Sequence, residues 1–190
     1  MKSTSQNQTF DKISYQNANI SQQEFFNCTF VKCDFTGSKF FNVSFIDCNF
    51  TDCNLSNVKI DNCGFLKVKF ENCKIIGVSF SQIKTLLIDW SFNRCLIELC
   101  DFSNLKMSQT NFLACTIKET DFIHTDLSRS DFSGSDLEKS RFQNSILEKV
   151  NFSEAKNYYI DLTQNKIKGA EFSYPGVLSL LKTFDITVKY

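Results

Sequence analysis

The chain has 190 residues, equal numbers of basic and acidic side chains, and 42% hydrophobic residues, among them 21 Phe. This length predicts one domain, and zero net charge excludes a global field that would draw the protein to nucleic acid or to a membrane surface. No apolar run approaches the ~18 residues of a membrane-spanning helix. Residues 1–9 form a polar N-terminal tail without the apolar segment of a secretion signal, so we expect a cytoplasmic protein.

From residue 10 onward, a large apolar residue, most often Phe, recurs at every fifth position. An α-helix would scatter such a series around its circumference, and a straight strand would place successive members on opposite faces. Neither element alone buries the series. Its first part comprises Phe10, Tyr15, Ile20, Phe25, Phe30, Phe35, Phe40, Phe45, Phe50, Leu55, Ile60, Phe65, Phe70, Ile75 and Phe80.

A second series, of small or compact residues, lies two positions before the large ones, as in Cys28 before Phe30 and Ser130 before Phe132. The buried spacing therefore alternates between two and three residues. A step of two keeps to one face of an extended segment, whereas a step of three on the same inner face requires a corner. We predict short strands and corners that wind around their own core.

A comparison of residues that are 20 positions apart in the sequence indicates how many sides each coil has. One such column contains only Phe once a two-residue offset is allowed: Phe10, Phe30, Phe50, Phe70, Phe92, Phe112, Phe132, Phe152 and Phe172. A three-sided coil would stack Phe40 with Leu55, which is less uniform. We therefore predict an all-β fold, a four-sided β-helix over residues 10–172, with roughly eight coils in a rod ~40 Å long at the usual strand spacing.

The phase of the repeat breaks at residues 81–91, because 12 residues separate Phe80 from Phe92. Leu87 is predicted to be the missing central residue. Trp90, the only Trp of the chain, then falls at a small inward site. One interpretation is a bulge that keeps the core filled. The other is a projecting loop that presents Trp90 to a partner protein.

The second part of the series runs from Phe92 to Phe172, with Asn157 as its polar member. Acidic side chains gather in its middle: Glu119, Asp121, Asp126, Asp131, Asp136 and Glu138. By phase, the four Asp side chains point outward, one on each side of a coil. The simpler interpretation is repeat residues that bond their own corner backbone. The alternative is a phosphate-like array that occupies a basic DNA-binding groove.

The last segment, residues 173–190, is predicted to cap the open end of the coil. Pro175 is well placed to open a short helix, and a short strand is expected at residues 185–188. The helix has too many apolar residues for one narrow stripe, so we also expect it to form a homodimer interface. The residues expected there are Leu178, Leu181, Phe184, Ile186 and Val188.

All nine Cys occupy the small inward site, which favours reduced core thiols over a disulfide framework or a metal site. Cys33, Cys53 and Cys73 stack in one column, so their redox state stays open. The single His, His124, lies outside the core by phase, and no Gly-rich phosphate loop precedes a helix. We expect no catalytic residues, no cofactor and no bound metal.

The repeat of a small residue, Asp or Asn, a large apolar residue and two polar residues resembles the pentapeptide-repeat family. Good copies are residues 33–37, 53–57, 125–129, 130–134 and 135–139. The resemblance covers about residues 10–172 and implies a right-handed quadrilateral β-helix. Within the family, the interrupted phase and the ending Leu180-Leu181 with Ile186 and Val188 resemble the Qnr/McbG-type topoisomerase-protecting proteins.

That resemblance implies a rod-like dimer, joined at its C-termini, that binds DNA gyrase or topoisomerase IV as a partial DNA mimic. Such a protein protects the enzyme from quinolones or toxins and does not bind nucleic acid directly. The partner-binding residues would be the acidic group and Trp90. Two departures are the neutral charge, where those proteins are usually acidic, and the short insertion. The alternative is a cytosolic interaction scaffold with no topoisomerase role.

Overall fold

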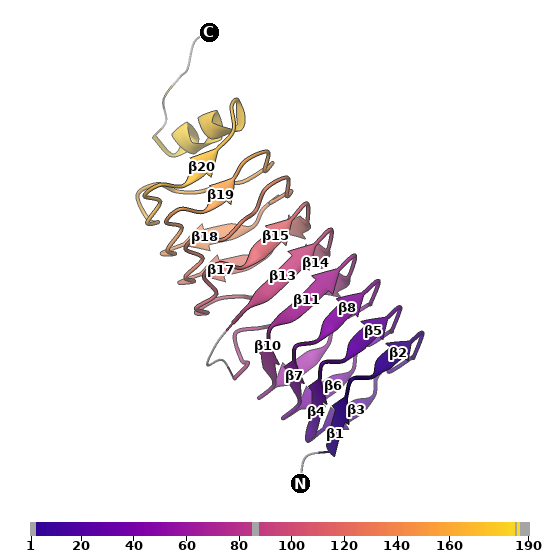
Figure 1. Ribbon diagram of the computed structural model, residues 1–190. Helices are drawn as coiled ribbons and strands as arrows, with labels where there is room; N and C mark the ends of the chain where they lie inside the picture. The colour runs from indigo at the N-terminus through magenta and orange to yellow at the C-terminus, as the bar shows by residue number, and fades with distance from the viewer. Residues whose placement is uncertain (1–2, 85–87, 185, 187–190) are drawn as a thin grey trace.

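The computed structural model describes residues 3–84, 88–184 and 186, which form a solenoid of short strands followed by one helical segment (Figure 1). The strands are β1 (Ser3–Gln6), β2 (Thr9–Asp11), β3 (Asn19–Ser21), β4 (Gln23–Phe26), β5 (Thr29–Val31), β6 (Lys39–Phe41), β7 (Ser44–Ile46), β8 (Asn49–Thr51), β9 (Lys59–Asp61), β10 (Gly64–Leu66), β11 (Val68–Glu71), β12 (Lys74–Ile76), β13 (Trp90–Asn93), β14 (Leu96–Glu98), β15 (Asn111–Leu113), β16 (Thr116–Lys118), β17 (Asp121–Ile123), β18 (Arg141–Gln143), β19 (Asn151–Phe152) and β20 (Glu171–Phe172). They are followed by the 3-10 helix η1 (Gly176–Phe184).

All strand pairs are parallel, and each joins residues one coil apart. Phe10 pairs with Phe30, Phe30 with Phe50 and Phe50 with Phe70, a register of 20 residues. Across the phase break the register becomes 22, because Phe70 pairs with Phe92. The longest sheet is the wall β2-β5-β8-β11-β13-β15, which runs through the break without interruption. The predicted four-sided β-helix with 20 residues per coil is confirmed.

Most corners use a residue in the left-handed region of backbone conformation, two positions after the large residue. Asn57, Asn62 and Gly77 have φ of 56°, 58° and 67°. Asn and Gly adopt this conformation at low cost, which explains their abundance in the corners. This is the turn that the spacing of three residues requires.

The core is a column of large side chains in which identical rings stack from coil to coil. The centroids of Phe30 and Phe50 lie 4.7 Å apart with an interplanar angle of 11°, and those of Phe92 and Phe112 lie 4.8 Å apart at 3°. Rings from adjacent walls meet edge to face, as Phe112 and Phe122 do at 84°. Stacked and edge-to-face pairs are both favourable, so the column contributes to stability beyond its buried area.

The small inward residues have a hydrogen-bonding role as well as the correct size. The Ser135 hydroxyl donates to the Phe112 carbonyl at 2.6 Å and accepts from the Cys115 amide at 2.8 Å. Without such a partner this buried N–H would be unpaired and costly. Thiols act similarly: the Cys95 amide donates to the Cys115 Sγ at 3.4 Å. The predicted core role of the cysteines is confirmed, since all nine are buried with free thiols.

Both ends of the repeat differ from the sequence-based prediction. The β-helix begins at Ser3 rather than at residue 10, because the polar strand β1 pairs with β4 in register. Near the other end, Asn157 is exposed with φ of 57°, and the next residue, Tyr158, fills the core position expected for it. The left-handed backbone at this position thus turns the polar side chain outward.

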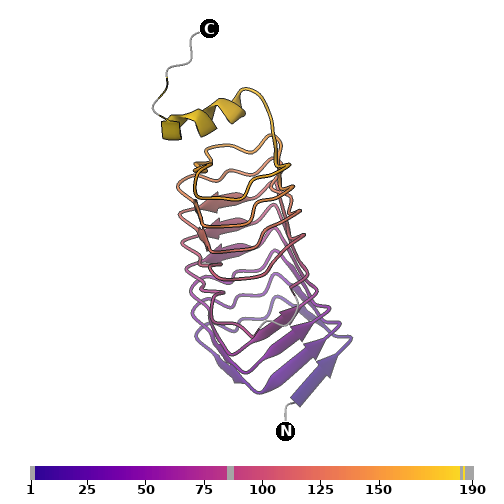
Figure 2. The same cartoon turned by 90° about the vertical axis from the view of Figure 1, so that its left-hand side faces the viewer.

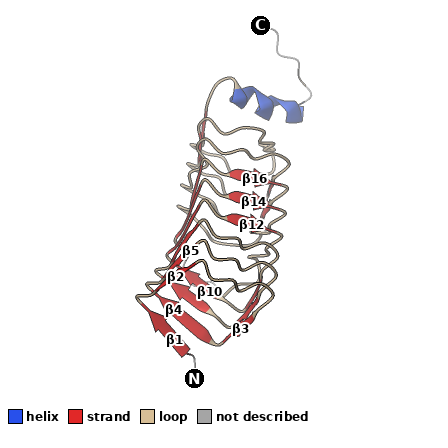
Figure 3. Cartoon of the chain, turned by 90° about the vertical axis from the view of Figure 1, so that its right-hand side faces the viewer, coloured by secondary structure: helices blue, strands red, loops and turns tan. Residues whose placement is uncertain are grey.

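The helix η1 lies across the C-terminal end of the solenoid (Figures 2 and 3). Leu180 is buried, and Val177 packs against the core cluster. The predicted capping helix is therefore present. Most of the strand expected at residues 185–188 lies outside the described residues.

Candidate protein-interaction surfaces

The acidic residues of the second half form ion pairs with basic residues in adjacent coils. Arg141 Nε and Nη2 each lie 2.5 Å from an oxygen of Asp121, and this hydrogen-bonded pair raises the pKa of the guanidinium. Lys139 lies 3.4 Å from Glu119. Lys118 lies 2.8 Å from Glu138, whose hydrogen bond raises the pKa of the lysine. These pairs reduce the negative charge that a partner would meet.

The three remaining members of the acidic group accept hydrogen bonds from their own corners. Asp126 Oδ1 accepts from the Ser128 amide at 2.9 Å, and Asp131 Oδ1 from the Ser133 amide at 2.8 Å. Asp136 Oδ1 accepts from the Glu138 amide at 3.3 Å. These contacts match the simpler interpretation, in which each Asp stabilises its turn. Their carboxylates are only half-buried, so they also remain available at the surface.

Trp90 lies in the core and not on a projecting loop, which corrects its assignment as a partner-binding residue. Its side chain is 2% exposed, and its indole N–H donates to the Phe65 carbonyl at 3.0 Å. The ring packs against Phe65, Phe80, Phe92 and Phe102. The side chain fills the core at the phase break. Leu87, the expected central residue, lies outside the described residues.

The residues predicted for the dimer interface are in part exposed. Phe184 is 47% exposed and Ile186 is 55% exposed, while Leu178 and Leu181 are half-buried. Val188 lies outside the described residues. The described members thus leave apolar surface at the C-terminal end of the rod, beyond what capping of the core requires.

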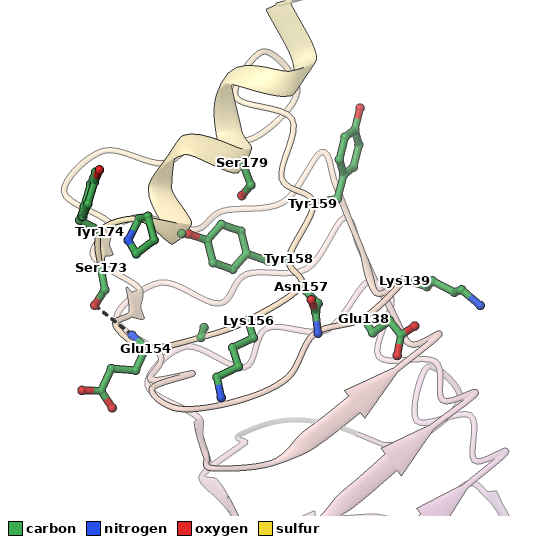
Figure 4. A pocket seen from close by; sticks show the side chains of 13 residues that line it. Glu138, Lys139, Glu154, Lys156, Asn157, Tyr158, Tyr159, Ser173, Tyr174 and Ser179 are labelled. Atoms are coloured by element: carbon green, nitrogen blue, oxygen red, sulfur yellow. Dashed lines mark hydrogen bonds between the residues drawn. The ribbon is translucent and has the colours of Figure 1, made fainter. Parts of the chain in front are cut away.

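A groove of about 1010 Å³ lies between η1 and the last coils (Figure 4). Tyr158, Tyr159 and Tyr174 line it, together with charged side chains such as Glu154 and Lys156. The Tyr158 hydroxyl is buried beneath η1 and has no hydrogen-bond partner among the described residues. The repeat pattern did not predict this groove. The one sequence feature that could have indicated it is the end of the repeat just before Pro175.

An apolar ladder on the outside of the first half was also missed. Phe26, Ile46 and Leu66 occupy consecutive positions in register on β4, β7 and β10. Phe41, on the neighbouring wall, is likewise exposed. Each lies one position after a large core residue, where most repeats carry a polar side chain.

The described residues contain no group of three or more His, Cys, Asp or Glu that could hold a metal ion. In the same part of the chain, no helix has the length and apolar character needed to cross a membrane. The candidate sites described above are outer surfaces: the acidic group, the C-terminal patch and groove, and the apolar ladder.

Several solved structures share this fold. A trypsin-treated variant of QnrB1, a plasmid-mediated fluoroquinolone resistance protein, superposes with a TM-score of 0.73 and 16% identity, covering 100% of this chain and 99% of that chain. HetL, a pentapeptide repeat protein involved in heterocyst differentiation regulation in the cyanobacterium Nostoc, gives a TM-score of 0.68 and 16% identity, covering 88% and 84%. At these identities the likeness shows the fold alone.

A search of curated proteins finds no match. The family model for the pentapeptide repeat region matches residues 23–99 and 83–152. These ranges span most of the coils described above. The chain therefore belongs to the pentapeptide-repeat family.

Proposed function

We propose that this chain is a non-enzymatic rod that binds DNA gyrase or topoisomerase IV and protects it from quinolones or toxins. The observation that supports this most is the likeness of fold to the QnrB1 variant, which covers 100% of this chain and 99% of that chain. The QnrB1 variant is described as a fluoroquinolone resistance protein. Function on such a fold resides in its surfaces, because the core is a packed column.

The charge distribution limits how such binding would work. A DNA mimic gains affinity from continuous negative charge along its length. Here Asp121, Glu119 and Glu138 are each paired with a cation. We therefore infer that shape and local contacts contribute more than a long-range field, with Asp126, Asp131 and Asp136 as the acidic residues most available to a basic groove. A homodimer joined through Phe184 and its neighbours would double the length of the rod.

The ion pairing also favours a second candidate, an interaction scaffold with no topoisomerase role. A surface with mixed charges suits protein partners in general, and HetL, which shares the fold, is described as involved in heterocyst differentiation regulation. The two candidates differ in one measurable respect, the effect on topoisomerase activity.

The deciding experiment is gyrase supercoiling in the presence of a fluoroquinolone, titrated with the purified protein. Restored supercoiling at stoichiometric or lower amounts would support the first candidate. If the drug remains fully active and the protein alone does not inhibit gyrase at high excess, the topoisomerase role is wrong and the scaffold remains. Topoisomerase IV decatenation is assayed in parallel.

A further inference from the structure

One wall of the β-helix lacks strand pairing between two successive coils of the described residues. The sheet β3-β6-β9 ends at β9. On the same wall, the next pairing begins at Ser79, which bridges to Asp101 in the following coil. No pairing joins β9 to the Ser79 segment in the described residues. At the same level, the wall containing β8, β11 and β13 is continuous.

The opening leaves backbone groups of β9 without partners. In intact coils of this wall, the amide of the large residue donates to the next coil, as Phe80 does to the Asp101 carbonyl at 2.7 Å and Phe102 to the Asp121 carbonyl at 2.8 Å. Among the described residues, the corresponding amides of Ile60 and Asn62 have no such carbonyl acceptor. Most backbone amides in folded proteins are paired, so these must bind water or another chain.

The opening has definite limits. Before it, the Asn57 amide donates to the Ile76 carbonyl at 2.7 Å, and after it the Lys84 amide donates to the Cys63 carbonyl at 2.8 Å. Between these closed points lies a groove of about 280 Å³, lined by residues 57–61 on one side and by Gly77, Ser79 and Gln82 on the other. The groove is thus a slot of about one strand in length beside an unpaired strand edge.

The side chains of β9 indicate what would fit. Lys59 and Asp61 point outward, and Ile60 points into the core. Lys39 and Lys59 are adjacent in register, and neither has a carboxylate partner among the described ion pairs. Opposite charges directly across a strand pair are favourable, so an added parallel strand should place an acidic residue beside Lys59 and a basic one beside Asp61.

The core behind the slot limits the central residue. Val58, Ile60, Val78 and Phe80 are buried there, and the void that they help to line holds only about 10 Å³. This space is less than a methylene-rich side chain needs, and filling a packed core with extra atoms is costly. The residue that faces Ile60 must therefore be Gly or Ala.

We propose that the open edge of β9 is a docking site for an extended segment of a partner protein, which adds as a parallel strand with an acidic–small–basic triplet opposite Lys59, Ile60 and Asp61. The main-chain hydrogen bonds supply affinity, and the flanking charges and the small residue supply selectivity. The site lies away from the C-terminal cap and does not depend on the partner being a topoisomerase.

The first test uses the free full-length protein and amide hydrogen exchange followed by NMR. The amides of Ile60 and Asn62 should exchange at least about tenfold faster than those of Phe80 and Phe102, which have carbonyl partners. Equal protection of all four amides would mean that the slot is closed, and the proposal would be wrong.

The second test titrates the protein with the acetylated and amidated peptide Ser-Glu-Ala-Lys-Ser, and exchange at the same amides is measured. Binding with a Kd on the order of 1 mM or tighter should slow exchange at Ile60 and Asn62. A peptide methylated at the Glu nitrogen, whose N–H should donate to the Val58 carbonyl as the Lys59 amide donates to the Ser38 carbonyl, should bind more weakly, and so should one with Phe in place of Ala. Absence of binding at several times that concentration, or equal binding of the N-methylated peptide, would overturn the proposal.

Matched variants locate the interaction. Lys59→Glu should weaken peptide binding by about fivefold or more, because attraction becomes repulsion. Lys32→Glu, which reverses an exposed lysine on another wall, should leave the Kd unchanged. If both variants weaken binding equally, the peptide responds to net charge and not to the slot.

Discussion

Arg141 lies one coil after Asp121, in register, and its guanidinium contacts both carboxylate oxygens of that residue. Asp121 also bridges in register to Asp101, so two carboxylates and one guanidinium share a column. The pKa of Asp101 is lowered: burial raises it, but hydrogen bonds from Ser103 and from two further serines outweigh that effect. These hydrogen bonds therefore keep the Asp101 carboxylate ionised at neutral pH.

Arg141→Ala should destabilise the protein modestly, by up to ~1 kcal/mol, since the pair is solvent-exposed and two like charges are left adjacent. Adding Asp121→Asn should recover part of that loss, because only one carboxylate then remains. Urea unfolding of the two single variants and the double variant measures the coupling. Additive effects would show that the contact contributes nothing measurable, and coupling that survives 1 M salt would contradict a surface ion pair.

The charge of the acidic group can be separated from its structural role. Asn54 and Asn151 accept the same corner hydrogen bonds as Asp126 and Asp131, from the Ser56 and Ser153 amides at 3.1 and 2.9 Å. A triple variant with Asn at positions 126, 131 and 136 should therefore fold with an unchanged Tm. If topoisomerase binding uses these carboxylates, protection in the supercoiling assay should fall about tenfold or more.

The matching triple variant with Ala in place of Asn removes the corner hydrogen bonds as well, and its Tm should fall. Full protection by the Asn variant would exclude these three carboxylates as the binding site. Loss of protection by the Ala variant alone would indicate a folding effect.

Trp90→Ala should cost ~3–5 kcal/mol of unfolding free energy, since a large buried aromatic is removed. Trp90→Phe should cost less, because it keeps most of the packing and loses only the indole donor to the Phe65 carbonyl. Denaturant titration followed by circular dichroism provides the comparison. Emission of this single Trp should be blue-shifted and insensitive to acrylamide in the native protein. Strong quenching would contradict its burial.

The architecture was predictable because the repeat is strictly local. For a large residue such as Phe50, the spacing alone predicts the wall on which it lies, its neighbours Phe30 and Phe70, and the inward direction of its side chain. Each coil repeats the same arrangement of inward and outward residues, so the spacing of the large residues predicts the structure of most of the chain.

The departures arise where one coil differs from the next. Spacing placed Trp90 at a small inward site but did not show that the extra residues leave core space for its ring. Asn157 occupied a central position by count, and only packing at the end of the rod shows that Tyr158 replaces it. The open edge of β9 depends on hydrogen bonds between coils, which periodicity cannot reveal.

Phe184→Glu should convert the proposed C-terminal dimer to a monomer without unfolding the rod. Phe184 is exposed, so the free monomer loses little packing, whereas a charge in the buried centre of an interface is costly. Light scattering measures the mass. Tyr174→Glu, an exposed change on the groove side of η1, serves as the control and should stay dimeric. A wild-type protein that is monomeric at all concentrations would remove the interface.

Stability should fall at alkaline pH through the buried thiols. Burial raises the pKa of Cys48 and of Cys100 to about 11, above the 9.0 of an unperturbed thiol. When the pKa of a thiol is higher in the folded state than in the unfolded state, folding favours its neutral form. The stabilisation that results is fully present below pH 9 and is lost as the pH rises toward 11.

Each thiol should account for ~2 kcal/mol of that loss, since one pKa unit corresponds to ~1.4 kcal/mol. Cys48→Val and Cys100→Val remove the titrating groups, and Val is already used at the small inward site by Val43 and Val58. The unfolding free energy of these variants, measured by urea titration, should fall less between pH 9 and 11 than that of the wild type. Parallel pH profiles would show that other groups, such as Tyr and Lys, cause the alkaline loss.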